Sequence, residues 1–138
     1  MSQLSTVRLL ALLLAALFAC AGCGAFTRPS DIVVADPAAA IADAQKMIAE
    51  KKGNPDKYRD NIPPADLPKS LQIPGLFYAQ VYDDHMNLIV ARQPDWKIGA
   101  RIWATGSTRA HSDRPTKYPG IMFFRYTHDA PDAPENLP

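Results

Sequence analysis

The sequence predicts an α+β fold, a small four-stranded antiparallel sheet with one N-terminal helix and a proline-rich strap. Three observations lead to this prediction. A stretch beginning near residue 36 has the start and stop residues of a helix. The chain contains 13 prolines against seven glycines, and these interrupt long regular elements. After Gly75 the apolar residues recur with a period of two, which is typical of strands. A mostly helical bundle is therefore disfavoured.

The helix is predicted from Pro37 to about Lys52. Asp36 is a good N-cap residue, and a proline in the first helical position loses no hydrogen bond. Gly53 provides the stop signal. The predicted apolar face is narrow and rich in alanine, with Ile41, Ala44 and Ile48. We therefore expect this helix to lie on the surface of the domain.

The stretch 54–75 is predicted to be an ordered strap. A sustained helix or central strand is excluded by Pro55, Pro63, Pro64, Pro68 and Pro74. Apolar residues are spaced through the stretch, and they favour packing against the domain: Ile62, Leu67, Leu71 and Ile73. One short helical turn is expected near Lys69.

The four strands are rich in β-branched and aromatic residues and are predicted at 76–82, 86–92, 97–105 and 121–127. Asp83-Asp84-His85 is expected to be a three-residue hairpin loop, and Pro94-Asp95 favours a type I turn. Apolar Ile98, Ala100 and Ile102 alternate with Lys97 and Arg101. Met122, Phe124 and Tyr126 alternate with Arg125. One apolar and one mixed face are typical of an antiparallel sheet covered on a single side.

The first 22 residues have the pattern of a secretory signal. A polar start with one basic residue, Arg8, precedes an unbroken apolar run, Leu9–Phe18. Small residues follow that run. Cys20-Ala21-Gly22-Cys23 resembles the lipobox of bacterial lipoproteins, with Cys23 as the lipidated cysteine. Cys20 departs from that pattern, because the family usually has leucine at this position.

Two other outcomes remain open for this segment. Cleavage after Ala21 would leave Gly22 as the first residue. An uncleaved segment from Leu9 to Phe26 would approach the length of a membrane-spanning helix, although Gly22 and Gly24 weaken that reading. The lipoprotein resemblance implies a membrane partner through the lipid. Gly24 follows Cys23 where inner-membrane lipoproteins tend to have an acidic residue, so the resemblance favours the outer membrane, facing the periplasm.

The chain of 138 residues has room for one domain. The expected organisation is a signal peptide at 1–22, a lipidated tether at 23–35, the α+β domain at 36–129 and a flexible tail at 130–138. The 15 basic and 14 acidic residues become balanced once Arg8 is removed, so the charge excludes a nucleic-acid partner. Both cysteines, Cys20 and Cys23, precede the domain, which excludes thiol catalysis and disulfides within it.

The segment 106–120 is the first candidate site. It joins two predicted strands by more residues than a hairpin needs, and it is rich in cationic groups that suit a phosphate or a carboxylate. The candidate ligand-binding residues are Arg109, His111, Arg114 and Lys117. The competing interpretation is a solvated loop, because loops are polar by default.

Catalytic and metal sites are weakly indicated. Asp84 beside His85 suggests a carboxylate that orients an imidazole, but adjacent residues in a tight loop rarely point toward each other. No catalytic residue is therefore assigned. No metal and no other cofactor is expected, because the spacing of His111, Asp113, His128 and Asp129 matches no known ligand pattern.

The sequence thus predicts a membrane-anchored envelope lipoprotein that acts as a binding or structural module. Its expected partner is an envelope protein or the cell wall. The alternatives are a small hydrolase-like periplasmic enzyme, using His85 or His111, and an anion or small-ligand binder at 106–120. Trp103 would lie on the second sheet face, either exposed to a partner or covered by the strap.

Overall fold

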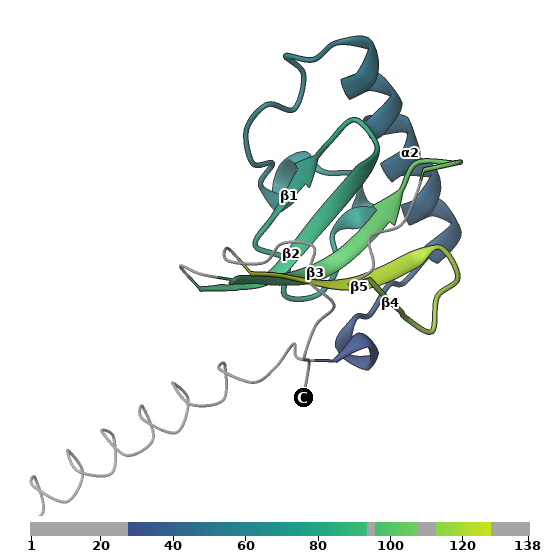
Figure 1. The fold of residues 1–138 in the computed structure, drawn as a ribbon, viewed down its shortest axis with the longest axis vertical. Helices are drawn as coiled ribbons and strands as arrows, with labels where there is room; N and C mark the ends of the chain where they lie inside the picture. The colour runs from purple at the N-terminus through teal and green to yellow at the C-terminus, as the bar shows by residue number, and fades with distance from the viewer. Residues whose placement is uncertain (1–27, 94–95, 108–112, 128–138) are drawn as a thin grey trace, which may run out of the picture.

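The computed structural model describes residues 28–93, 96–107 and 113–127, which form one antiparallel sheet with a helix on one side (Figure 1). The predicted α+β class is confirmed. The predicted signal and lipobox, the turn residues 94–95 and the predicted tail lie outside the described residues.

Helix α2 spans Pro37–Gly53, as predicted to within one residue. The Asp36 carboxylate accepts a hydrogen bond from the backbone N–H of Ala39 at 3.0 Å, which satisfies one of the free amides of the first turn. The buried residues of the helix are Ala40, Ala44, Met47 and Ile48. Ile41 lies at the margin of the core, because the buried stripe is centred on the two alanines.

The strap between α2 and the sheet contains two short 3-10 helices, Pro64–Asp66 and Lys69–Leu71, the second where a helical turn was expected. Leu67, Leu71 and Ile73 are buried in the same core as the helix residues. Ile62 forms an isolated antiparallel bridge with Ala79 at the edge of the sheet. The strap therefore packs on the helix side of the sheet, and it does not cover the other face.

The sheet has five strands in the order β1-β2-β3-β5-β4, and all neighbours are antiparallel. The strands are β1 Tyr78–Val81, β2 His85–Gln93, β3 Trp96–Trp103, β4 Arg114–Pro115 and β5 Ile121–Thr127. The prediction of four strands is wrong by the short β4. A strand of two residues carries no detectable period, and it forms only because it pairs with Met122 and Phe123 of β5.

One face of the sheet packs against α2 and the strap. Alternate residues on the central strands supply it, among them Leu88, Ala100, Ile102 and Phe123. Phe124 lies on the opposite face in a second cluster with Tyr78 and Ile89. The alternation of Phe124 and Tyr126 with Arg125 predicts that the Phe124 side of β5 meets the helix, and this prediction is wrong. Both sides of this strand are apolar, so alternation alone does not show which side meets the helix.

A bulge in β2 lies beside a glycine of β3. Ile89 pairs with Gly99 and Ala91 pairs with Ile98, which leaves Val90 as the extra residue. A Cβ at Gly99 would lie 1.9 Å from the Leu88 carbonyl oxygen. The close approach of β2 and β3 at this point therefore requires glycine.

The chain is already packed before α2. Ile32 and Val34 are buried in the core, so the packed region begins before the expected domain start at residue 36. The Val34 backbone N–H donates to the Tyr118 hydroxyl at 3.1 Å. This bond joins the segment 28–35 to the chain that leads into β5.

Candidate functional site

The four predicted ligand-binding residues are only partly located. Arg109 and His111 lie outside the described residues. Arg114 lies in β4, opposite Phe123, whereas Lys117 is exposed with its ammonium 5.2 Å from the Tyr118 ring centroid. The anion site at 106–120 therefore stays a prediction.

Neither α2 nor the strap covers the opposite face of the sheet, which we call the open face for that reason. It contains a buried polar network centred on Arg101. Asn87 and Arg101 are only 5% and 9% exposed. Arg101 Nε donates to Asn87 Oδ1 at 2.8 Å, and Arg101 Nη1 donates to Asp113 Oδ1 at 2.9 Å. The guanidinium carbon also lies 4.4 Å from the Phe124 ring centroid, within range of a cation–π contact.

Asp113 connects the 106–120 segment to this network. Its side chain is fully buried, and its second oxygen accepts a 2.6 Å hydrogen bond from Trp103 Nε1. Burial raises the pKa of Asp113, although the charge of Arg101 opposes that shift. Burial likewise lowers the pKa of Arg101. This salt bridge holds Asp113, and with it that part of the 106–120 segment, on the open face.

Three rings stand side by side at the end of strands β1, β2 and β3. The His85 ring stacks on Tyr82 with centroids 4.4 Å apart and an interplanar angle of 17°. On its other side it lies 4.8 Å from the Trp103 ring centroid. The Tyr82 hydroxyl donates to Gln80 Oε1 at 3.2 Å. Hydrogen bonds to Gln80, Asp84 and Asp113 therefore restrain all three rings.

Asp84 and His85 do contact each other, contrary to the expectation for adjacent loop residues. His85 Nδ1 and Asp84 Oδ1 are 2.6 Å apart. His85 already belongs to β2, and the Tyr82 backbone N–H donates to its carbonyl, so only Asp84 has the freedom of a turn residue. Burial lowers the pKa of His85, although the Asp84 hydrogen bond opposes the shift. At neutral pH the imidazole is uncharged and oriented by the carboxylate.

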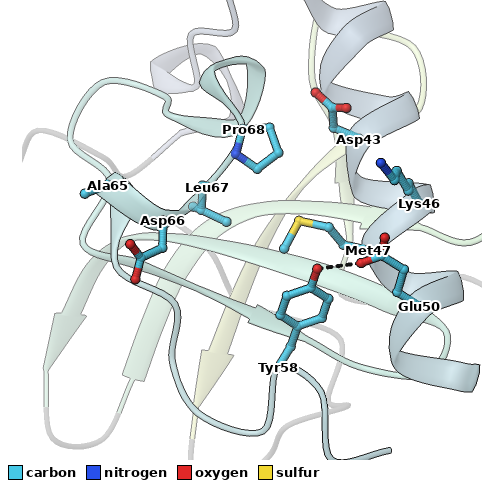
Figure 2. A pocket seen from close by; sticks show the side chains of 9 residues that line it. All are labelled: Asp43, Lys46, Met47, Glu50, Tyr58, Ala65, Asp66, Leu67 and Pro68. Carbon is cyan, nitrogen blue, oxygen red and sulfur yellow. Dashed lines mark hydrogen bonds between the residues drawn. The ribbon is translucent and has the colours of Figure 1, made fainter. Parts of the chain in front are cut away.

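A hollow lies between α2 and the strap (Figure 2). Its volume is about 370 Å³, and Met47 and Leu67 are the buried apolar residues that line it. Glu50 Oε2 accepts from the Tyr58 hydroxyl at 2.6 Å and from Lys57 Nζ at 2.8 Å. These hydrogen bonds lower the pKa of Glu50. The two carboxylates on the helix side of the hollow are thus engaged by the chain itself, since Asp43 accepts from the Ser70 hydroxyl.

Sequence reasoning did not find the network on the open face. The strand period places Arg101 on the mixed face of the sheet, and no pattern in the sequence indicates Asn87. The only available signal was a cation between apolar residues in a strand. Nothing in the sequence pairs Arg101 with Asp113, because the two residues lie on different elements.

The chain was compared with protein-family models, curated proteins and solved structures, and none of the three comparisons gave a match. Among residues 28–93, 96–107 and 113–127, no helix is long and apolar enough to cross a membrane. The same residues contain no group of three or more His, Cys, Asp and Glu side chains that would hold a metal ion.

Proposed function

We propose that this protein is a lipid-anchored module of the bacterial cell envelope that binds a partner through the open face of its sheet. The lipobox resemblance at Cys20–Cys23 supports the anchor. The open face supports the binding role. On this face Tyr82 is 40% exposed. Its ring stacks on His85, which in turn contacts the ring of Trp103. Rigid tyrosine and tryptophan rings bind a partner with little loss of conformational entropy.

The arrangement of Tyr82, His85 and Trp103 is the observation that carries the binding proposal. Their polar atoms are engaged by neighbouring side chains, so the rings are preorganised before any partner arrives. Both members of the buried Arg101–Asp113 pair contact Trp103: Asp113 accepts the hydrogen bond of its indole N–H, and the Arg101 guanidinium carbon lies 5.4 Å from its ring centroid. Such a surface suits a partner with an amphipathic face, such as another envelope protein or the cell wall.

The anchor is tested by metabolic labelling with a palmitate analogue. We expect the parent and Cys20→Ser to incorporate the label and to fractionate with membranes. Cys23→Ser should do neither, because the acceptor sulfur is lost. Cys20→Ser is the matched control, since it changes a cysteine that cleavage would remove. Continued labelling of Cys23→Ser would overturn the assignment.

The binding face is tested by photo-crosslinking in intact cells. A benzophenone amino acid at Tyr82 should give a discrete adduct with an envelope component. The same amino acid at Asp56, an exposed residue in the turn after α2, should give none. Equal adduct patterns at both positions would remove the proposal that the open face is the binding surface.

A hydrolase-like enzyme is the second candidate, and the 2.6 Å contact between Asp84 and His85 favours it. A carboxylate-oriented neutral imidazole is the usual form of a general base. If the protein acts in this way, it will hydrolyse a model ester faster than His85→Gln and Asp84→Asn do. Equal rates for all three proteins would dispose of this candidate.

The remaining alternative is an anion binder at 106–120, supported by the exposed cation of Lys117 and by Arg114 nearby in the chain. Inorganic phosphate is the simplest probe. Under this alternative the variant Arg109→Ala with Arg114→Ala would lose phosphate binding. Titration curves identical to those of the parent would exclude this site.

A further inference from the structure

The first described residues fix where a lipid at Cys23 would attach the domain. Arg28 precedes the 3-10 helix Pro29–Asp31, and the next residues, Ile32 and Val34, are buried in the core. The Val34–Tyr118 hydrogen bond holds this segment against the chain leading into β5. The segment that enters from the anchor is thus firmly attached to the domain.

The same end of the molecule contains several exposed side chains. Figure 1 shows the 3-10 helix Pro29–Asp31, the start of α2 and the turn before β5 at this end. A Cβ at Gly120 would lie 3.0 Å from the Ile41 side chain, so this turn lies against the first turns of α2. We call these exposed residues the anchor-proximal end: Arg28, Ser30, Val33, Lys117 and Pro119.

The chemistry of the anchor-proximal end suits a phospholipid surface. Val33 is 48% exposed and presents an aliphatic side chain at this end of the domain. The cations of Arg28 and Lys117 are available for headgroup phosphates. Two carboxylates lie nearby, and backbone amides engage both: Asp31 accepts from Arg28 N–H and Asp36 accepts from Ala39 N–H.

The distance from the anchor is limited by covalent geometry. Arg28 follows Cys23 by only five residues, which span at most about 18 Å when fully extended. Helix α2 has 17 residues and is therefore about 25 Å long. Its N-terminus lies at the anchor-proximal end and its C-terminus lies at the opposite end of the domain (Figure 1). A lipid at Cys23 would hold one end of α2 much nearer the bilayer than the other.

We propose that the anchor-proximal end rests on the headgroup layer of the bilayer and that α2 points away from the membrane. This proposal rests on the lipid anchor of the proposed function, and it adds which surface of the domain faces the lipid. Val33 and Pro119 enter the interfacial region, and Arg28 and Lys117 pair with phosphates. The hollow, which lies beside residues 43–50 of α2, is then farther from the membrane than the start of that helix.

The experiment uses the processed protein extracted from cell membranes. It is reconstituted in vesicles of phosphatidylethanolamine and phosphatidylglycerol in equal parts, with a phospholipid carrying a photoreactive headgroup. Crosslinked peptides are mapped by mass spectrometry after flotation. We expect crosslinks within 28–36 and 115–120 and none within 50–60.

Two matched lysine variants sharpen the test. Lys117→Gln should lower the crosslink yield at the anchor-proximal end about fivefold, the factor expected for one cation at an anionic surface. Lys52→Gln removes another exposed cation, at the far end of α2, and should leave the yield unchanged. Vesicles of phosphatidylcholine alone should abolish the difference between the parent and Lys117→Gln.

The two ways of failing are distinct. Protein that floats with the vesicles but crosslinks at 50–60, or through Tyr82 on the open face, overturns the orientation and leaves the anchor intact. Equal effects of the two lysine variants also overturn it. Protein that does not float at all overturns the anchor itself and, with it, the orientation.

Discussion

The Asp113 carboxylate is buried between two donors, Arg101 and Trp103, and it has no access to solvent. A carboxylate in such a place is tolerated only because both oxygens are hydrogen-bonded and a cation lies 2.9 Å away. This one residue connects the long segment after β3 to the open face. Replacing it therefore affects both the fold and the proposed binding surface.

The first prediction concerns this ion pair. Asp113→Ala should lower the free energy of unfolding by about 3–5 kcal/mol, because it leaves the Arg101 cation buried without a partner. The double variant Arg101→Met with Asp113→Leu should lose less free energy of unfolding than Arg101→Met and Asp113→Leu lose in sum. Urea denaturation measures the parent, Asp113→Ala, Arg101→Met, Asp113→Leu and the double variant. Strict additivity would show that the pair is not coupled.

The second prediction concerns the pH dependence of stability at His85. Because burial lowers the pKa of His85 in the folded state, the unfolded chain binds more protons at pH values below about 6.5. The stability contributed by neutral His85 is therefore present above that pH and is lost as the pH falls. His85→Gln should flatten the decrease in unfolding free energy between about pH 7 and pH 5. Parallel pH profiles for parent and variant would contradict this.

At the scale of elements, β2 and β3 approach each other closely at the bulge around Val90. The approach depends on the missing side chain at Gly99, since a Cβ there would overlap the Leu88 carbonyl. The ring of Phe124 from β5 lies over the same position, 3.1 Å from where that Cβ would be. The bulge, the glycine and the ring therefore form one packed unit across three strands.

The third prediction compares two glycines. Gly99→Ala should destabilise the protein by about 1–3 kcal/mol, because the strands must separate to admit a methyl group. Gly53→Ala should stabilise it by about 0.4–1 kcal/mol, because nothing lies within 4 Å of that position and alanine restricts the unfolded chain. Thermal unfolding of both variants gives the comparison. A neutral effect at Gly99 would show that the strands adjust freely there.

Local signals predicted the elements well wherever the signal was strong. Helix α2 followed from its cap and stop residues, and the strap followed from its prolines. The long strands followed from their period, with limits that differ by at most two residues. β4 was missed because two residues show no period, and the phase of β5 was wrong because both its faces are apolar.

At the scale of the whole molecule, the hydrogen bond between Val34 and Tyr118 spans 84 residues of sequence. It holds the end of the predicted tether, 23–35, against the turn before β5. The same contact joins the two segments whose exposed residues form the anchor-proximal end of the proposed orientation.

The fourth prediction tests that contact. Tyr118→Phe removes the acceptor of the Val34 amide, so hydrogen exchange at Val34 should become faster, while exchange in β2 and β3 should stay the same. The expected loss of stability is about 1–3 kcal/mol, the cost of a buried donor without a partner. Tyr58→Phe, which loses a hydroxyl bonded to Glu50 on the rim of the hollow and far from Val34 in the sequence, serves as the control. Unchanged exchange at Val34 would show that the bond does not hold the segment.

Local chemistry is enough to predict the α+β class, the ends of α2, the course of the strap and the positions of the long strands, because a cap, a proline or a period of two indicates each of them. Tertiary contacts settle which face of β5 meets the helix, that the strap covers the helix side, and that Arg101 is buried with Asp113. These features depend on contacts between residues far apart in the chain, and no local pattern encodes such pairs.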